Sequence, residues 1–174
     1  MTKVEELRAT RDIAKGEELT DCYLDLVSQG RNSRDQRREL LQQGYGFKCT
    51  CQVCDLSDEL SEENDNLRRE ASKHCDDCQD LNEILDDEEL LIKMSKAERW
   101  LELCVLLNYK VTHQIEAANA VFSIAMMVGK VEKAKEVAEQ GLQMAIIRFG
   151  QENKNNLVED WQRRYSDPVL YMIG

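Results

Sequence analysis

The chain has 174 residues, an apolar fraction of 42% and a formal net charge of −11, which fits a globular protein of one domain or two small ones. Affinity for nucleic acid depends largely on Lys and Arg side chains that neutralise phosphates, so this acidic balance argues against direct nucleic-acid binding. A basic partner such as a lysine-rich protein tail is easier to accept, although the simpler interpretation is that the acidic helices are merely solvated. No apolar run approaches the roughly 20 residues that span a bilayer, so we expect no membrane insertion.

The first 28 residues predict a short β segment. Val4 to Ile13 alternates imperfectly between apolar and polar residues, and Glu18 to Leu24 forms a second short run. Lys15-Gly16 between them predicts a turn. We therefore expect two short strands here, in a chain that is otherwise mainly helical.

Residues 29–55 begin with a helix signal. Ser33 and Gln36 form a capping-box pattern, and the helix that follows is predicted to end near Gly44. Arg37 and Arg38 lie on this helix. They could contact an acidic partner, but a solvated helix face is the simpler interpretation.

Cys49, Cys51 and Cys54 come next, with the spacing C-x-C-x-x-C. Three thiols within this short stretch suit a soft cation, and structural zinc takes four ligands, usually including a closely spaced Cys pair. The spacing therefore predicts a zinc site that is one ligand short, with metal-free surface thiols as the alternative. Seven cysteines is an odd count for a disulfide framework and the sequence opens without a signal-peptide pattern, so we expect reduced thiols and a cytoplasmic or nuclear location.

Cys75 and Cys78, beside His74, also have the spacing of a metal-ligating pair. One of them could supply the missing fourth ligand by folding back toward the first three thiols. Their acidic, polar surroundings favour exposed thiols instead. Cys22 and Cys104 are predicted to be small core residues.

Residues 56–88 are rich in Asp, Glu, Asn and Ser and poor in large apolar side chains. This composition predicts a mobile linker or a loosely held helix, and we place the domain boundary here. Beyond it, apolar residues recur at helical spacing and predict three helices. The recurring positions are Leu91, Met94, Leu101, Cys104 and Leu107, then Ile115, Ala118, Phe122 and Ala125, then Val131, Ala134, Ala138, Leu142 and Ala145.

Gly129-Lys130 separates the second and third of these helices. Small residues on both would let them approach closely as an antiparallel hairpin, which resembles a tetratricopeptide-type unit. The small residues are Ala118, Ala125, Ala134 and Ala138. A further helix over 155–165 is expected to cover the exposed face and to end before Pro168.

Several short motifs follow one another in the first 55 residues. They are Leu7-Arg8-Ala9-Thr10-Arg11-Asp12-Ile13, Lys15-Gly16-Glu17-Glu18-Leu19, Cys22-Tyr23-Leu24-Asp25 and Tyr45-x-Phe47-x-Cys49-x-Cys51-x-x-Cys54. In this order they resemble the end of the SET domain and the post-SET zinc segment of the SET and MYND-domain protein-lysine methyltransferases, or of their fungal SET relatives. The resemblance implies the end of a SET domain over 1–28, a post-SET helix and zinc segment over 29–55, an acidic linker over 56–88 and a tetratricopeptide-like helical domain over 89–174.

The resemblance also implies roles for single residues. Tyr23 matches the catalytic tyrosine beside the methyl-transfer channel, Tyr45 matches a ring of the lysine channel, and Phe47 matches a ring that packs near the adenine of the cofactor. Three of the four zinc ligands are matched by Cys49, Cys51 and Cys54. The implied activity is transfer of a methyl group from S-adenosylmethionine to a lysine of a protein substrate.

The family's cofactor-binding Asn-His motif, with the fourth zinc Cys close behind it, is not found in this sequence. We therefore expect the chain alone to be inactive and S-adenosylmethionine to bind only in a complete parent protein, which leaves the status of the chain as an enzyme open. The alternative is a non-catalytic, zinc-stapled helical adaptor that binds partner peptides in a tetratricopeptide-like groove.

Overall fold

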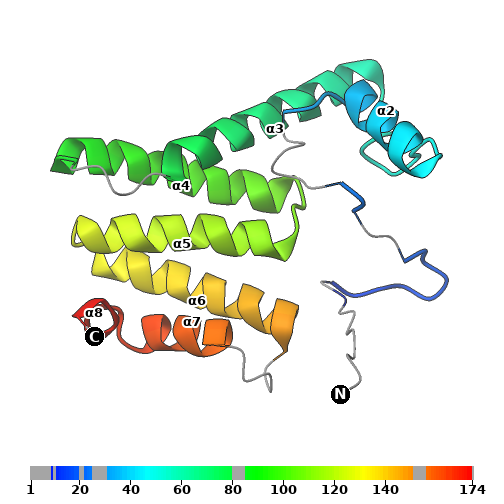
Figure 1. Cartoon of the computed structure of the whole chain (residues 1–174). Coiled ribbons are helices and arrows are strands. Elements are labelled where there is room, and N and C mark those ends of the chain that lie inside the picture. The colour runs from blue at the N-terminus through cyan, green and yellow to red at the C-terminus, as the bar shows by residue number, and fades with distance from the viewer. Residues whose placement is uncertain are drawn as a thin grey trace. The chain divides into compact units, whose positions relative to one another are not determined.

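The computed structural model describes residues 9, 11–19, 22–24, 31–79, 85–150 and 156–173. Within these ranges the chain is mainly helical, as predicted (Figure 1). Its helices belong to two compact units. The first unit contains α2 (Arg34–Tyr45), α3 (Asp58–Gln79) and α4 (Asp87–Leu106). The second contains α5 (Val111–Met127), α6 (Val131–Phe149), α7 (Asn156–Ser166) and α8 (Pro168–Ile173). None of the helices described is both long and apolar enough to cross a membrane.

The predicted β segment is not found in the part of it that the structure describes. Residues 9, 11–19 and 22–24 form no strand, and the remainder of the segment lies outside the described residues. The predicted turn is present: the backbone N–H of Glu17 donates to the carbonyl of Ala14 at 3.1 Å, and Gly16 has a φ of 86°. A short strand is stable only when neighbouring strands pair with it, so its sequence pattern alone is not enough.

The start of α2 forms as the capping box predicts. The Ser33 side chain accepts from the backbone N–H of Gln36, and the Gln36 side chain accepts from the backbone N–H of Ser33. The helix ends at Tyr45, one residue past the expected Gly44, because Gly46 takes the left-handed conformation at φ 76° and closes the helix with a hydrogen bond to the carbonyl of Gln42.

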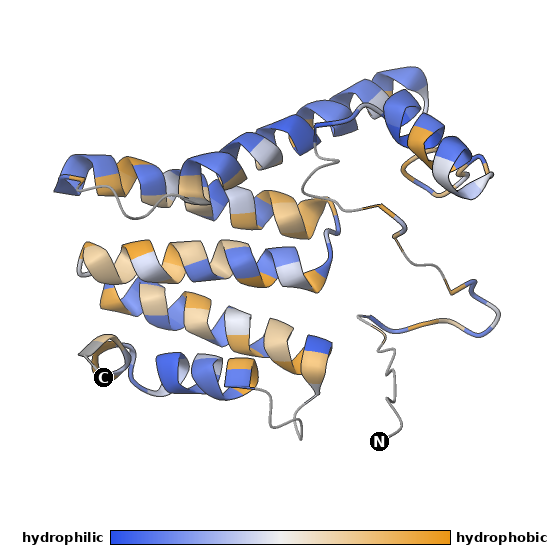
Figure 2. Cartoon of the chain, viewed as in Figure 1, coloured by the Kyte–Doolittle hydropathy of each residue, from blue (hydrophilic) through white to orange (hydrophobic). Residues whose placement is uncertain are grey.

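The acidic stretch predicted as a linker or a loosely held helix is mostly α3, a helix of 22 residues that packs against α4. Figure 2 shows α3 as a largely hydrophilic helix. Its buried face consists of small or polar side chains, so it lacks the large apolar residues by which a packed helix is recognised in a sequence. The buried residues are Ser61, Asp65, Arg68, Ala71, Ser72, Cys75 and Cys78.

Arg37 is not on a solvated face, and that prediction was wrong. The residue is 5% exposed, and its Nη1 donates to the carboxylate of Asp65 and to the carbonyl of Asn32, both at 2.7 Å. Asp65 also accepts from the backbone N–H of Arg34 at 2.8 Å. A buried charge is tolerated when it is paired and hydrogen-bonded, which is why this arginine can join α2 to α3.

In the second unit, α5 and α6 form the predicted antiparallel hairpin (Figure 1). Gly129 between them adopts a φ of 71°, in the left-handed region that glycine enters at little cost. Ala118 and Ala125 on α5 and Ala134 and Ala138 on α6 are fully buried, so the predicted close approach of the two helices is confirmed. The likeness to a tetratricopeptide repeat stays a prediction.

Helix α7 packs against α6 through Trp161, which is 1% exposed. Gly141 on α6 makes room for this ring, because a Cβ placed there would lie 2.5 Å from the indole carbons. The helix ends at Ser166, before Pro168, as expected. Pro168 then begins α8, a helix that was not predicted. Proline fits the first position of a helix, because a backbone N–H at that position would have no partner within the helix.

Replacing Phe122 with alanine is expected to lower the free energy of unfolding by about 3–5 kcal/mol. Phe122 is 1% exposed and meets the rings of Trp161 and Tyr171 edge to face, with centroids 6.2 and 5.7 Å away. Leu142, whose place in the apolar repeat of α6 also predicts burial, is only half-buried. Leu142→Ala should therefore cost clearly less in the same denaturant titration, and equal losses for the two variants would contradict this view of the core.

Candidate functional site

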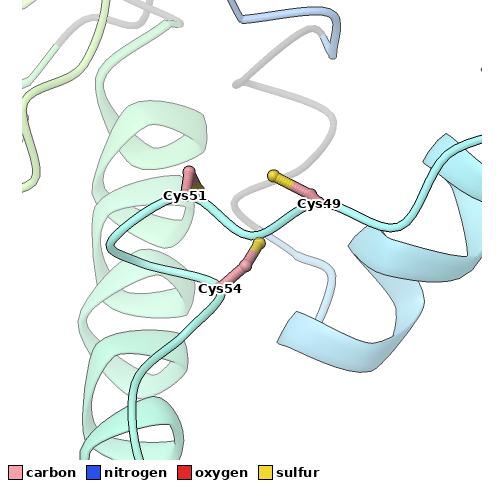
Figure 3. Close-up of side chains that lie close together, drawn as sticks. All are labelled: Cys49, Cys51 and Cys54. Atoms are coloured by element: carbon pink, nitrogen blue, oxygen red, sulfur yellow. The ribbon is translucent and has the colours of Figure 1, made fainter. Parts of the chain in front are cut away.

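The three clustered cysteines lie on residues 46–57, the loop between α2 and α3, which we call the metal loop. Gly46 turns the chain out of α2, and the backbone N–H of Asp55 donates to the carbonyl of Cys51 at 2.9 Å. The Sγ atoms of Cys49, Cys51 and Cys54 all lie within 4.8 Å of one another. Figure 3 shows the sulfurs of Cys49 and Cys54 directed into the space between the three residues. The predicted gathering of these thiols is therefore confirmed.

The cluster fits a tetrahedral metal with one further position to fill. Zn–S bonds of about 2.3 Å place thiolate sulfurs ~3.8 Å apart, so only small shifts of these side chains are needed. Cys54 is buried, Cys49 is half-buried and Cys51 is exposed, which leaves one side of the cluster open to a fourth ligand. No other His, Cys, Asp or Glu of the described residues joins the group.

The thiols of Cys51 and Cys54 differ in acidity. Burial raises the pKa of Cys54 to about 12, and the negative charges of Cys51 and Cys49 add to this rise. Burial also opposes ionisation of Cys51, but hydrogen bonds from the backbone N–H of Cys54 and from the two neighbouring thiols favour its thiolate and lower its pKa overall. A metal bound by all three sulfurs must therefore displace the proton of Cys54.

Cys75 and Cys78 are not part of this cluster. Both are 3% exposed on the buried face of α3, so the expectation of exposed thiols was wrong. Burial raises the pKa of Cys78 to about 11. The structure does not bring either thiol to the metal loop as a fourth ligand. Of the two cysteines expected in the core, Cys104 is fully buried and Cys22 is half-buried.

Three aromatic residues singled out in the sequence meet just ahead of the metal loop cysteines; we call them the aromatic cluster. The ring of Tyr23 lies 5.0 Å from that of Tyr45 and 5.5 Å from that of Phe47, both edge to face. The Tyr45 hydroxyl donates to the Tyr23 carbonyl at 3.3 Å. All three residues are exposed to solvent, at 59%, 56% and 36%, so they form an accessible surface rather than a core. Their individual roles stay predictions.

Two arginines of α2 contact the metal loop, which the sequence did not predict. Arg38 Nη2 donates to the carbonyl of Cys54 at 2.6 Å, and Arg34 Nη1 donates to the carbonyl of Leu56 at 2.9 Å. Their spacing of four residues could have predicted these contacts, because it places both side chains on one face of the helix just before the cysteines.

No family model matches the chain. Parts of it are nevertheless similar to curated enzymes. Over 70 residues, 40% of this chain, it is 34% identical to the histone-lysine N-methyltransferase set5 of Schizosaccharomyces pombe. Over 52 residues, 30% of this chain, it is 46% identical to the histone-lysine N-methyltransferase SMYD3 of Homo sapiens. Over a stretch of the same length it is 42% identical to the histone-lysine N-methyltransferase ATXR4 of Arabidopsis thaliana.

These matches are partial on both sides. They cover 21% of the length of set5, 11% of SMYD3 and 15% of ATXR4. The relatives come from a yeast, an animal and a plant, and all three are named as histone-lysine methyltransferases. Over part of its length, the chain is therefore similar to SET-domain histone-lysine methyltransferases, the family that its tyrosine and cysteine motifs resemble.

Proposed function

We propose that this chain supplies the closing part of the SET domain, the post-SET metal centre and the helical domain of a protein-lysine N-methyltransferase. In this proposal Cys49, Cys51 and Cys54 bind zinc, and the aromatic cluster forms part of the channel in which methyl transfer occurs. The substrate is a lysine of another protein. A lysine-rich tail would suit this chain, because its positive charge complements the net charge of −11.

The observation that carries the proposal is the contact of Tyr23 with Tyr45 and Phe47. Tyr23 lies 22 residues before Tyr45, yet its ring touches both of the others. Tyr45 and Phe47 immediately precede the metal loop cysteines, so a metal that orders this loop would also steady the two rings. The two exposed tyrosines and the metal loop thus form one continuous feature of the first unit.

The residue types suit the chemistry. S-adenosylmethionine, when bound in a complete protein, supplies a methyl group on a positively charged sulfur. Transfer needs the lysine amine uncharged although its solution pKa is about 10.4, and a channel walled by aromatic rings disfavours the charged ammonium. The same rings attract the methylated ammonium through cation–π contact, so the product is tolerated. In the proposed arrangement the Tyr23 hydroxyl orients the amine, and Phe47 packs beside the cofactor's adenine.

A longer protein that contains these residues together with the cofactor-binding strands would test the roles. Tyr23→Phe should lower kcat about tenfold or more with little change in cofactor affinity, because the hydroxyl acts on the amine. Phe47→Ala should instead weaken cofactor binding. Tyr165→Phe, which removes the same hydroxyl on α7, is the matched control and should leave both constants unchanged. Wild-type turnover in Tyr23→Phe would refute the assigned role.

The 174 residues alone should neither bind S-adenosylmethionine measurably nor methylate histone peptides, because the sequence holds no Asn-His pair. Isothermal titration calorimetry with the cofactor is the direct measurement. Tight binding to this chain would mean that the cofactor is held by residues other than those the family uses. It would refute the proposal that the cofactor binds only in a complete protein.

A further inference from the structure

We infer that Arg34 and Arg38 are positioning residues of the metal loop: they hold its backbone so that the three thiols are gathered before a metal binds. The inference rests on the proposed metal centre, and it concerns two side chains that are not metal ligands.

Both arginines donate hydrogen bonds to the end of the metal loop, residues 54–57, which leads into α3. Arg38 donates to the carbonyl of Cys54, which is itself one of the three thiol residues, at 2.6 Å. Arg34 donates to the carbonyl of Leu56 at 2.9 Å and, through Nη2, to the carboxylate of Asp58 at 2.7 Å. Because a guanidinium has five N–H donors in a fixed planar fork, Arg34 can bind the end of the loop and the first residue of α3 at once.

The helix that carries these arginines is itself fixed. Arg37, on the same helix, pairs with Asp65 of α3 at 2.7 Å, and both side chains are buried. Asp65 also accepts from the backbone N–H of Arg34. The loop end is therefore tied to α2, and α2 is tied by its first turns to α3, so the position of Cys54 does not depend on the loop alone.

Holding the loop in advance favours metal binding. A loop that is already shaped loses less conformational freedom when its thiols are drawn around an ion than a loop that must first be ordered. Removing residues that orient metal ligands from behind usually lowers metal affinity about 10- to 100-fold. A role restricted to helix packing would instead lower the stability of the metal-free chain and leave the affinity of the folded chain unchanged.

The test is a titration of the reduced, metal-free, 174-residue chain with Co²⁺, followed through the thiolate-to-metal absorption and converted to zinc affinity by competition. Arg38→Ala and Arg34→Ala should each weaken binding about 10-fold, and the double variant should approach 100-fold. Arg38→Lys keeps the charge and a single donor nitrogen, and it should recover part of the loss. Arg69→Ala is the matched control, since Arg69 is an exposed arginine of α3 that donates to Asn66 within its own helix.

Thermal unfolding of the metal-free variants, followed by far-ultraviolet circular dichroism, separates positioning from folding. The inference requires weaker Co²⁺ binding in variants that keep the wild-type helical signal. Wild-type affinity in the double variant would overturn the inference and leave the metal centre intact. Loss of binding that follows loss of helix, without recovery in Arg38→Lys, would also overturn it. If the wild-type chain bound no Co²⁺, the proposed metal centre would fail as well.

Discussion

Replacing Cys54 with serine is expected to lower zinc affinity by at least about 100-fold. In the proposed metal centre soft thiolate ligands hold zinc, whereas a serine hydroxyl stays protonated and binds the ion poorly. Cys54 is also the most buried of the three thiols, so its loss removes the ligand that lies deepest in the cluster. Competition of the reduced protein with a chromophoric chelator measures the change, and Cys78→Ala, which removes a buried thiol outside the cluster, should leave zinc affinity near that of the wild type.

The same experiment has a predicted pH dependence. In the metal-free chain the pKa of Cys54 is raised to about 12, so at neutral pH its thiol is protonated and the metal must displace that proton. Zinc affinity should therefore rise with pH and fall on acidification, because protons compete for the sulfurs. Reduced wild-type protein that contained no zinc, and whose thermal unfolding a chelator left unchanged, would exclude the metal site.

Replacing Asp65 with alanine is expected to lower the free energy of unfolding by about 3–5 kcal/mol. The carboxylate pairs with Arg37 at 2.7 Å and also attracts the charge of Arg68, and both arginines are 5% exposed. Its removal would leave two buried guanidinium groups without this partner. Removing one member of a buried ion pair lowers stability strongly, because the remaining charge stays buried without compensation. Arg68 keeps its hydrogen bond to Asn64 at 2.7 Å and its place over the Tyr109 ring, which moderates the loss.

Glu102→Ala is the matched control for this prediction. Glu102 pairs with Arg99 at 2.9 Å, but its side chain is 64% exposed, and exposed pairs contribute about 0–1 kcal/mol. Urea unfolding of the two variants under identical conditions gives the comparison. Equal losses would mean that the Arg37–Asp65 pair is no more important than a surface contact.

The elements that sequence analysis predicted correctly depend on residues close together in the chain. Ser33 and Gln36 form the predicted cap of α2 because the reciprocal hydrogen bonds join residues three apart. Helices α4 to α7 follow from apolar residues that repeat every three or four positions. Cys49, Cys51 and Cys54 could be predicted to share one site because they lie within six residues of one another in the chain.

The failures have a common cause in long-range contacts. Helix α3 has few large apolar residues, and its buried face carries Asp65 and Arg68, whose burial depends on charged partners elsewhere. Arg37 was placed on the surface because its partner lies 28 residues away. Charged side chains are almost never buried without a partner. When the partner is distant in the sequence, the sequence pattern therefore predicts an exposed side chain.

The sequence by itself determined the helices that carry their own apolar stripe, the cap and stop of α2, and the identity and close spacing of the three metal-loop thiols. Tertiary structure alone decided that Asp65 draws Arg37 into the interior, that Arg34 and Arg38 grip the backbone of the metal loop, and that Tyr23 meets Tyr45 and Phe47. The physical reason is range. Helical periodicity and caps act over three or four residues, whereas these contacts join residues 16 to 28 positions apart, whose meeting depends on how the helices pack.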